Sequence, residues 1–316
     1  MENLSPIIEN KTTPKDVFSK QLLPYLALVS GILALSLSAL FVRWAQAPGT
    51  VTSFYRMLVA AIVLFPLLLR QKNNLKSSLK KWWLFPVLGG LFTAIDHATW
   101  STSISYTYVG NATLFNNLAP LWVSLIALVV WHEKLTRKFW LGLVFTLSGA
   151  VIVLAANLIF QPQFSRGDGL AIFSSLFYAG YFLITQRGRQ YFDTLSYVWA
   201  VAVVSAVVLL GINLLSKQPL TGYPTSTYLA FLGAGLISQV IGYFSVGYAL
   251  GHLPASIVSP TMITQPVITA LMAIPLAGEI LLPIQWLGGL IVLFGIYLIN
   301  RSYNQTVKKA QALNKY

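Results

Sequence analysis

The chain has 316 residues, of which 56% are hydrophobic and only 9% are charged, and it contains no cysteine. A soluble protein carries about 25% charged residues, so this composition excludes a soluble globular domain, a disordered chain and a disulfide-built module. The 21 basic and 8 acidic residues give a net charge of +13. In so apolar a chain this excess indicates membrane orientation, and no nucleic-acid partner is expected.

Ten apolar runs are long enough for a helix to cross a hydrocarbon core about 30 Å thick, which takes about 20 residues. In chain order they lie at 22–42, 50–69, 82–104, 111–131, 138–158, 168–186, 194–215, 226–249, 255–277 and 283–300. The runs are too long and uniform for barrel strands. The sequence therefore predicts an all-α integral membrane protein with ten transmembrane helices and polar tails at 1–21 and 301–316.

The basic residues outside the spans divide unevenly between the two sides of the membrane. With the N-terminus inside, 17 of the 21 Lys and Arg residues lie in inner segments and 3 in outer ones. Loops rich in Lys and Arg stay in the cytoplasm. We therefore expect a multi-pass protein of the plasma or inner membrane, surrounded by the lipid bilayer, with both termini cytoplasmic.

The two halves of the chain match each other at a constant offset of 146 residues. The matched pairs are Pro120 with Pro266, Glu133 with Glu279, Leu135 with Leu281, Trp140-Leu141-Gly142 with Trp286-Leu287-Gly288, and Gly149 with Gly295. Each half holds five spans, and an odd number makes the second half enter the membrane from the opposite side. The sequence thus predicts two inverted five-helix repeats, at 22–158 and 168–300, with a substrate site between them near the midplane.

Several local motifs accompany this repeat. They are Pro120…Glu133-Lys134-Leu135, Pro266…Glu279-Ile280-Leu281, Phe54-Tyr55-Arg56, Asn111-Ala112-Thr113 and Leu118-Ala119-Pro120-Leu121. With the ten spans, they resemble the EamA-type members of the drug/metabolite transporter superfamily over about residues 22–300. The resemblance implies a carrier of the cytoplasmic membrane, often an exporter, for amino acids, other metabolites or drugs, with a central cavity between the repeats.

Four titratable side chains other than tyrosine fall within the spans and away from their cytoplasmic ends: Arg43, Arg56, Asp96 and His97. A charge in hydrocarbon costs about 3 kcal/mol on insertion scales. We therefore expect Asp96 to pair with Arg56 or Arg43 across helices, at the outer rim of the cavity. Such a pair either fixes helix packing or serves substrate charge or proton coupling. His97 is either a proton relay or is held by a neighbouring hydroxyl or carbonyl group.

Other polar side chains recur at helical spacing within the spans. They are Trp100 at i+4 from Asp96, Asn116 and Asn117 before Pro120, Ser174 with Tyr178 and Tyr181, Gln239 with Tyr243, and Gln265 before Pro266. Such groups either line a wet cavity or join helices by hydrogen bonds, and both interpretations stay open. Tyrosine, tryptophan and amide side chains suit uncharged or zwitterionic solutes with apolar or aromatic groups.

Pro120 and Pro266 each remove a backbone donor within a span, which predicts a kinked helix. A pair at equivalent positions of two repeats points to a binding or rocking site, and the alternative is a static kink.

The sequence offers no paired intramembrane acids, no His-Glu-x-x-His motif and no glycine-rich phosphate-binding loop. We therefore expect neither an enzyme nor an ATP-driven pump, with no cofactor and no metal. The leading hypothesis is a secondary transporter that exports small metabolites such as amino acids by alternating access, with proton coupling as one possible energy source. A passive facilitator or channel is the alternative, because no sodium-site cluster is evident. Both a monomer and a homodimer are compatible with the sequence.

Overall fold

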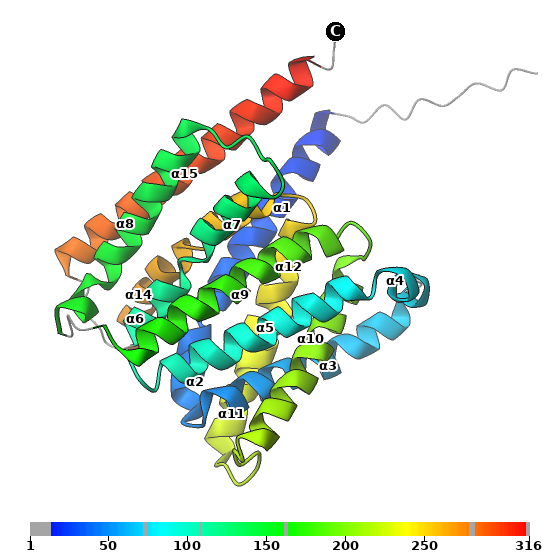
Figure 1. The fold of residues 1–316 in the computed structure, drawn as a ribbon, viewed down its shortest axis with the longest axis vertical. Helices are drawn as coiled ribbons and strands as arrows, with labels where there is room; N and C mark the ends of the chain where they lie inside the picture. Colours follow the sequence, from blue (N-terminus) through cyan, green and yellow to red (C-terminus); the bar gives the residue numbers. More distant parts are fainter. Residues whose placement is uncertain (1–13, 72–74, 108, 161–163, 278–281, 314–316) are drawn as a thin grey trace, which may run out of the picture.

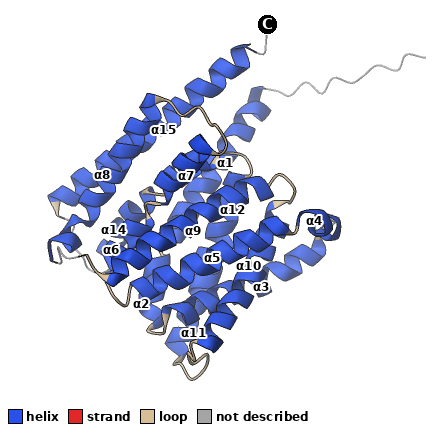
Figure 2. Ribbon diagram, in the orientation of Figure 1, coloured by secondary structure: helices blue, strands red, loops and turns tan. Residues whose placement is uncertain are grey.

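The computed structural model describes residues 14–71, 75–107, 109–160, 164–277 and 282–313, and within these ranges its regular structure is helical, without a strand (Figures 1 and 2). The first half contains α1 (Pro14–Ser36), α2 (Ser38–Ala45), α3 (Gly49–Arg70), α4 (Leu75–Trp82), α5 (Leu84–Ser103), α6 (Val109–Asn116), α7 (Ala119–Val129) and α8 (Arg137–Phe160). The second half contains α9 (Arg166–Gly188), α10 (Thr194–Leu215), α11 (Thr225–Gly233), the π-helix η1 (Ala234–Tyr243), α12 (Phe244–Leu250), α13 (Ala255–Thr261), α14 (Thr264–Ala277) and α15 (Pro283–Leu313).

Nine helical segments of the described chain are long and apolar enough to cross a membrane. Helix α5 has 20 residues and occupies the third predicted span, but it is not one of the nine. Its second half carries Asp96, His97 and several hydroxyl residues, which lower its hydropathy. The structure therefore confirms an all-helical membrane protein with nine candidate spans, and the tenth span stays a prediction.

The predicted tails are partly helical. Helix α1 begins at Pro14, ahead of the first predicted span, and α15 continues past residue 300 to Leu313. The rest of both tails, at 1–13 and 314–316, lies outside the described residues.

Three of the predicted spans are not continuous helices. The first is divided at Leu37 into α1 and α2, the fourth at 117–118 into α6 and α7, and the ninth at 262–263 into α13 and α14. Pro120 stands in the first turn of α7 and Pro266 in the first turn of α14. A first-turn N–H has no partner within its own helix, so proline is tolerated there but cannot continue the preceding helix. Backbone hydrogen bonds still bridge the turns at 117–118 and 262–263, and each helix pair forms one candidate span, so the equivalent helices of both halves are interrupted next to the predicted prolines.

The packing of α8 against α15 relates the two halves directly. An added Cβ at Gly142 would lie 2.7 Å from the Gly295 carbonyl oxygen, and one at Gly149 would lie 2.7 Å from the Gly288 carbonyl oxygen. The 146-residue offset maps Gly142 onto Gly288 and Gly149 onto Gly295, so these are one contact repeated with the halves exchanged. The two helices run antiparallel along one flank of the bundle (Figure 1), as an inverted repeat predicts.

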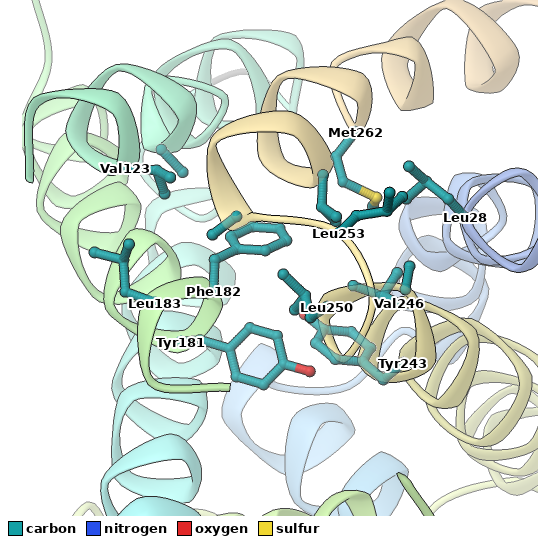
Figure 3. Packing of buried hydrophobic residues seen from close by; sticks show 14 of the residues in the cluster. Leu28, Val123, Tyr181, Phe182, Leu183, Tyr243, Val246, Leu250, Leu253 and Met262 are labelled. Atoms are coloured by element: carbon teal, nitrogen blue, oxygen red, sulfur yellow. The ribbon is translucent and has the colours of Figure 1, made fainter. Parts of the chain in front are cut away.

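The central core is built by helices from both halves. Leu28 of α1 and Val123 of α7 meet Phe182 of α9, Leu250 of α12 and Met262, and all five side chains are buried (Figure 3). The core therefore holds the halves together around the bundle centre, where the buried polar side chains also lie.

Candidate substrate-binding site

Asp96 is the buried acid of this central region, with only 6% of its surface exposed. Its Oδ1 atom accepts a hydrogen bond from Ser174 Oγ at 2.5 Å and another from Asn116 Nδ2 at 3.0 Å. Asn116 Nδ2 also lies 2.9 Å from Ser174 Oγ. Because Asp96 and Asn116 belong to α5 and α6 and Ser174 belongs to α9, this group joins the two halves.

Arg56 of α3 is the buried base, with 3% of its surface exposed. Its Nε atom donates to Gln239 Oε1 at 3.0 Å and its Nη1 atom donates to Ser38 Oγ at 2.7 Å. The remaining nitrogen, Nη2, is buried without a hydrogen-bond partner, and so is Nε2 of Gln239. The guanidinium carbon lies 5.3 Å from the centre of the Tyr243 ring, within the range of a cation–π interaction.

His97 and Tyr243 connect these two groups. The His97 Nε2 atom lies 3.4 Å from the Tyr243 hydroxyl oxygen, and both side chains are buried. Tyr243 also meets Tyr181 edge to face, with 5.3 Å between ring centres (Figure 3). The repeat offset maps His97 onto Tyr243, so two equivalent positions of the halves touch at the centre of the molecule.

The expected ion pair of Asp96 is wrong. Among the described residues Asp96 bonds to Ser174 and Asn116, whereas Arg56 bonds to Gln239 and Ser38. Arg43, the other predicted partner, is exposed at the end of α2. Neutral donors and acceptors thus satisfy most of both charged groups without a direct contact between them.

Six of the predicted site residues gather in this central cluster: Arg56, Asp96, His97, Tyr181, Gln239 and Tyr243. Half-buried Tyr178 stands next to them, with its ring 4.7 Å from that of Phe182. Ser38 was missed by the sequence analysis. No sequence signal distinguishes it, because it reaches Arg56 only through the break at Leu37.

The other predicted residues have different surroundings. Asn117 Nδ2 donates to the Thr113 carbonyl oxygen at 2.8 Å, and Gln265 Nε2 donates to the Leu35 carbonyl oxygen at 3.1 Å. Trp100 is half-buried further along α5. Pro120 and Pro266 are buried at the helix breaks. Gln265 therefore joins helices here.

A second set of contacts joins the halves at the end predicted to be cytoplasmic. Ser256 Oγ donates to Glu133 Oε2 at 2.8 Å, and the Arg187 guanidinium carbon lies 4.6 Å from the Trp131 ring centre. Nearby, Arg189 Nε donates to the Gly247 carbonyl oxygen at 3.0 Å. Partial burial lowers the pKa of the Arg189 guanidinium, and the Asp193 carboxylate opposes this effect. Glu279 and Leu281, the partners of Glu133 and Leu135 in the repeat, lie outside the described residues.

Two cavities lie near this same end. One, of about 490 Å³, is lined by residues of α15 from Tyr297 to Gln305. The other, of about 280 Å³, lies between the segment around Glu133, the start of α13 at Ser256 and Tyr303 of α15. Neither is lined by a residue of the central cluster, so the central cavity stays an expectation. In the described part of the chain, no three His, Asp or Glu residues are grouped as metal ligands.

Several known proteins are similar to this chain. A transporter of Bacillus subtilis (strain 168), YyaM, is 23% identical over 77% of this chain and 81% of its own length. A protein of Streptantibioticus cattleyicolor named "Probable terminal-alkyne amino-acid exporter" is 22% identical over 61% of this chain and 64% of its own length. A protein of Salmonella typhimurium named "Probable amino-acid metabolite efflux pump" is 22% identical over 60% of this chain and 66% of its own length.

The fold is also found in a crystal structure of a protein that is 18% identical, with a TM-score of 0.74 over 89% of this chain and 97% of the other. The model of the EamA-like transporter family matches the sequence twice, at residues 22–155 and 165–301. These two matches cover both halves and nearly the whole chain. The protein therefore belongs to the EamA-like transporter family of the drug/metabolite transporter superfamily, and it is a membrane transporter, not an enzyme.

Proposed function

We propose that the protein is a secondary transporter that exports small metabolites, such as amino acids or related amphipathic solutes, by alternating access between its two halves. The central polar cluster carries this proposal, because its contacts cross between the halves. Asp96 bonds to Ser174, Arg56 bonds to Gln239, and His97 meets Tyr243. A rocking motion of one half against the other would open these contacts to each side of the membrane in turn.

The names of two relatives support the substrate class and the direction. Both the Streptantibioticus and the Salmonella proteins are named for the export of amino acids or their metabolites. The rings of Tyr181 and Tyr243 beside the buried Arg56 and Asp96 give the site the mixed polar and apolar character that such solutes need.

We also propose the arrangement in the membrane. Helix α5 is the tenth span, because it packs against α9 and α10 inside the bundle, and the 17 inner basic residues hold both termini in the cytoplasm of an inner-membrane protein. Proton exchange is the proposed driving reaction, since Asp96 and His97 are titratable groups within the site.

Counterflow in proteoliposomes tests the carrier function. Vesicles containing the purified protein are loaded with an unlabelled amino acid, and entry of the labelled form is followed over a range of concentrations. A carrier gives saturable uptake that the internal amino acid accelerates. Flux that rises linearly with concentration and ignores the internal pool would favour the passive channel. An imposed pH gradient should drive accumulation above the external concentration if protons are exchanged.

A further inference from the structure

The central cluster contains two buried charges of opposite sign that form no direct ion pair. Arg56 and Asp96 are 3% and 6% exposed, and no ion pair joins them among the described residues. A charge inside a membrane protein is costly unless it is paired or used. These two side chains are therefore suited to a ligand that carries one negative and one positive group.

Two neighbouring side chains, Arg56 and Gln239, each carry a buried hydrogen-bond donor without an acceptor. Nη2 of Arg56 and Nε2 of Gln239 are both buried and both unpartnered. The hydrogen bond of 3.0 Å between Arg56 Nε and Gln239 Oε1 holds the two side chains together. Their unpartnered donors are therefore available to the same ligand group. A carboxylate has two oxygen atoms that accept such a pair of N–H groups.

Near Asp96, the complementary group is an acceptor. Both hydrogen bonds that the carboxylate accepts end on Oδ1, one from Ser174 and one from Asn116. Within the described part of the chain, no donor reaches Oδ2. An ammonium group carries three donors and no acceptor, and it would place a positive charge in direct contact with the Asp96 carboxylate.

Aromatic side chains connect the two charged groups. The Arg56 guanidinium carbon lies 5.3 Å from the Tyr243 ring centre, and the Tyr243 hydroxyl meets His97, the residue next to Asp96. The ring of Tyr181 on α9 packs edge to face against that of Tyr243 on η1 (Figure 3). The ammonium and carboxylate groups of an α-amino acid share one carbon atom, so its apolar side chain lies beside both charges, and the Tyr181 and Tyr243 rings offer an apolar surface there.

We propose that this cluster binds the two charges of a zwitterionic amino acid, with its carboxylate on Arg56 and Gln239 and its ammonium group on Asp96. The assignment rests on the proposed function in one respect, namely that the central cluster is the substrate site. It adds which chemical group of the substrate each side chain recognises.

Binding of three matched compounds to the purified protein tests the assignment. Phenylalanine carries both charges, phenethylamine lacks the carboxylate, and 3-phenylpropionate lacks the ammonium group. Titration calorimetry should give phenylalanine the highest affinity, by about 10- to 100-fold over each truncated compound, the range expected for hydrogen bonds to charged groups. Equal affinities for all three compounds, or no binding of any of them, would overturn the assignment.

Variants assign each charge to its side chain. In Arg56→Gln the preference for phenylalanine over phenethylamine should disappear, while the preference over 3-phenylpropionate remains. In Asp96→Asn the reverse should hold. Arg43→Gln, which removes an exposed cation from the neighbouring helix α2, is the matched control and should keep both preferences. A variant at Arg56 or Asp96 that also keeps both would show that its charge does not contact the ligand.

A second variant covers the case in which Arg56→Gln does not fold. Gln239→Glu keeps the size of the side chain and places a carboxylate against Arg56, where it competes with that of the ligand. Its preference for phenylalanine over phenethylamine should fall at least tenfold, and an unchanged preference would refute the Arg56–Gln239 subsite. Selective binding without counterflow would instead refute the transport function and leave the assignment intact.

Discussion

Asp96 is a carboxylate inside a helix bundle whose charge is held by a hydroxyl and an amide group. Ser174 is completely buried, and its Oγ atom donates at 2.5 Å to Asp96 Oδ1. A hydrogen bond to a charged group is worth about 1.5–3 kcal/mol, roughly twice the value for a neutral pair. The serine on α9 is therefore as important to the acid as an ion-pair partner would be.

Replacing Ser174 by alanine should lower the free energy of unfolding by about 1.5–3 kcal/mol, because Asp96 keeps only its bond from Asn116. Ser124→Ala is the matched control. Ser124 is equally buried, but its hydroxyl donates only to the Pro120 carbonyl within the same helix, so we expect a loss below about 1 kcal/mol. Denaturant unfolding of the purified protein, followed by circular dichroism, compares the two. Equal losses would contradict the importance of this bond.

Scarcity of charge identified Arg56, Asp96 and His97 in the sequence, because each is expensive in a membrane. Their partners could not be predicted in the same way. Ser174 and Asn116 are ordinary polar residues of apolar helices, and small polar groups join helices throughout membrane proteins. The sequence therefore located the buried charges but predicted an ion pair that the structure replaces with neutral contacts.

At the scale of helices, the breaks determine how neighbouring elements pack. Where α1 ends before Leu37, the Leu35 carbonyl oxygen accepts from Gln265 Nε2 at 3.1 Å and the Ser36 carbonyl oxygen accepts from Thr269 Oγ1 at 2.9 Å. Within a membrane, freed carbonyl groups need such partners. Helix α14 thus satisfies the end of α1 and ties the two halves together.

Gln265→Leu should destabilise the protein by about 1–3 kcal/mol, because the Leu35 carbonyl loses this side-chain donor in an apolar environment. Thr264→Val serves for comparison, since the Thr264 hydroxyl donates only to the Thr261 carbonyl nearby. The midpoint of thermal unfolding in detergent should fall clearly for Gln265→Leu and little for Thr264→Val. If Gln265→Leu melts like the unmodified protein, the interpretation of Gln265 as a helix-joining residue is wrong.

At its glycine positions, the contact of α8 with α15 has no room for a side chain. A Cβ at Gly149 would lie 2.6 Å from the Val292 backbone nitrogen, so Gly149→Ala must push two backbones apart. We expect lower thermal stability and lower yield. Gly211→Ala in α10 meets nothing within 4 Å, and removing an unneeded glycine from a helix should stabilise it by up to about 1 kcal/mol. Opposite shifts in the unfolding midpoint are the expected result, and a shift in the same direction would contradict it.

The apolar runs predicted where helices lie much better than where they break. The lipid-facing and the buried face of a membrane helix are both apolar, so the sequence of α11, η1 and α12 forms one uniform apolar run. Its middle ten residues, Ala234–Tyr243, nevertheless form a π-helix. The prolines at 120 and 266 predicted the positions of two interruptions correctly. The break at Leu37 has neither proline nor glycine beside it, and no sequence signal could have shown it.

The orientation of the whole molecule in the bilayer can be tested by cysteine labelling. The chain contains no cysteine, so a single introduced cysteine is the only thiol that reacts. Single cysteines at Thr221, between α10 and α11, and at Gln190, between α9 and α10, replace exposed residues. In intact cells a membrane-impermeant maleimide should label Thr221→Cys and leave Gln190→Cys unlabelled until the membrane is permeabilised. The opposite pattern would reverse the orientation that the basic loops predict.

The internal repeat was the sequence feature that predicted most about the overall fold. Matches of proline, glutamate and tryptophan at one offset predicted two related halves, and the family matches at 22–155 and 165–301 confirm them. The same offset also makes His97 and Tyr243 equivalent positions, but their residue types differ and give no sequence match. Because the two residues differ chemically, the sequence comparison did not predict the contact between His97 and Tyr243.

That difference has a thermodynamic consequence. Under the proposed alternating access, a chain with identical halves would have inward-open and outward-open states related by a two-fold rotation and equal in free energy. Here the positions equivalent to Arg56 and Asp96 in the second half are Ala202 and Gly242, so both charges of the central cluster belong to the first half. Each 1.4 kcal/mol of resulting inequality changes the populations about tenfold. The empty transporter should therefore rest mainly open to one side, and its substrate would meet unequal affinities on the two faces of the membrane.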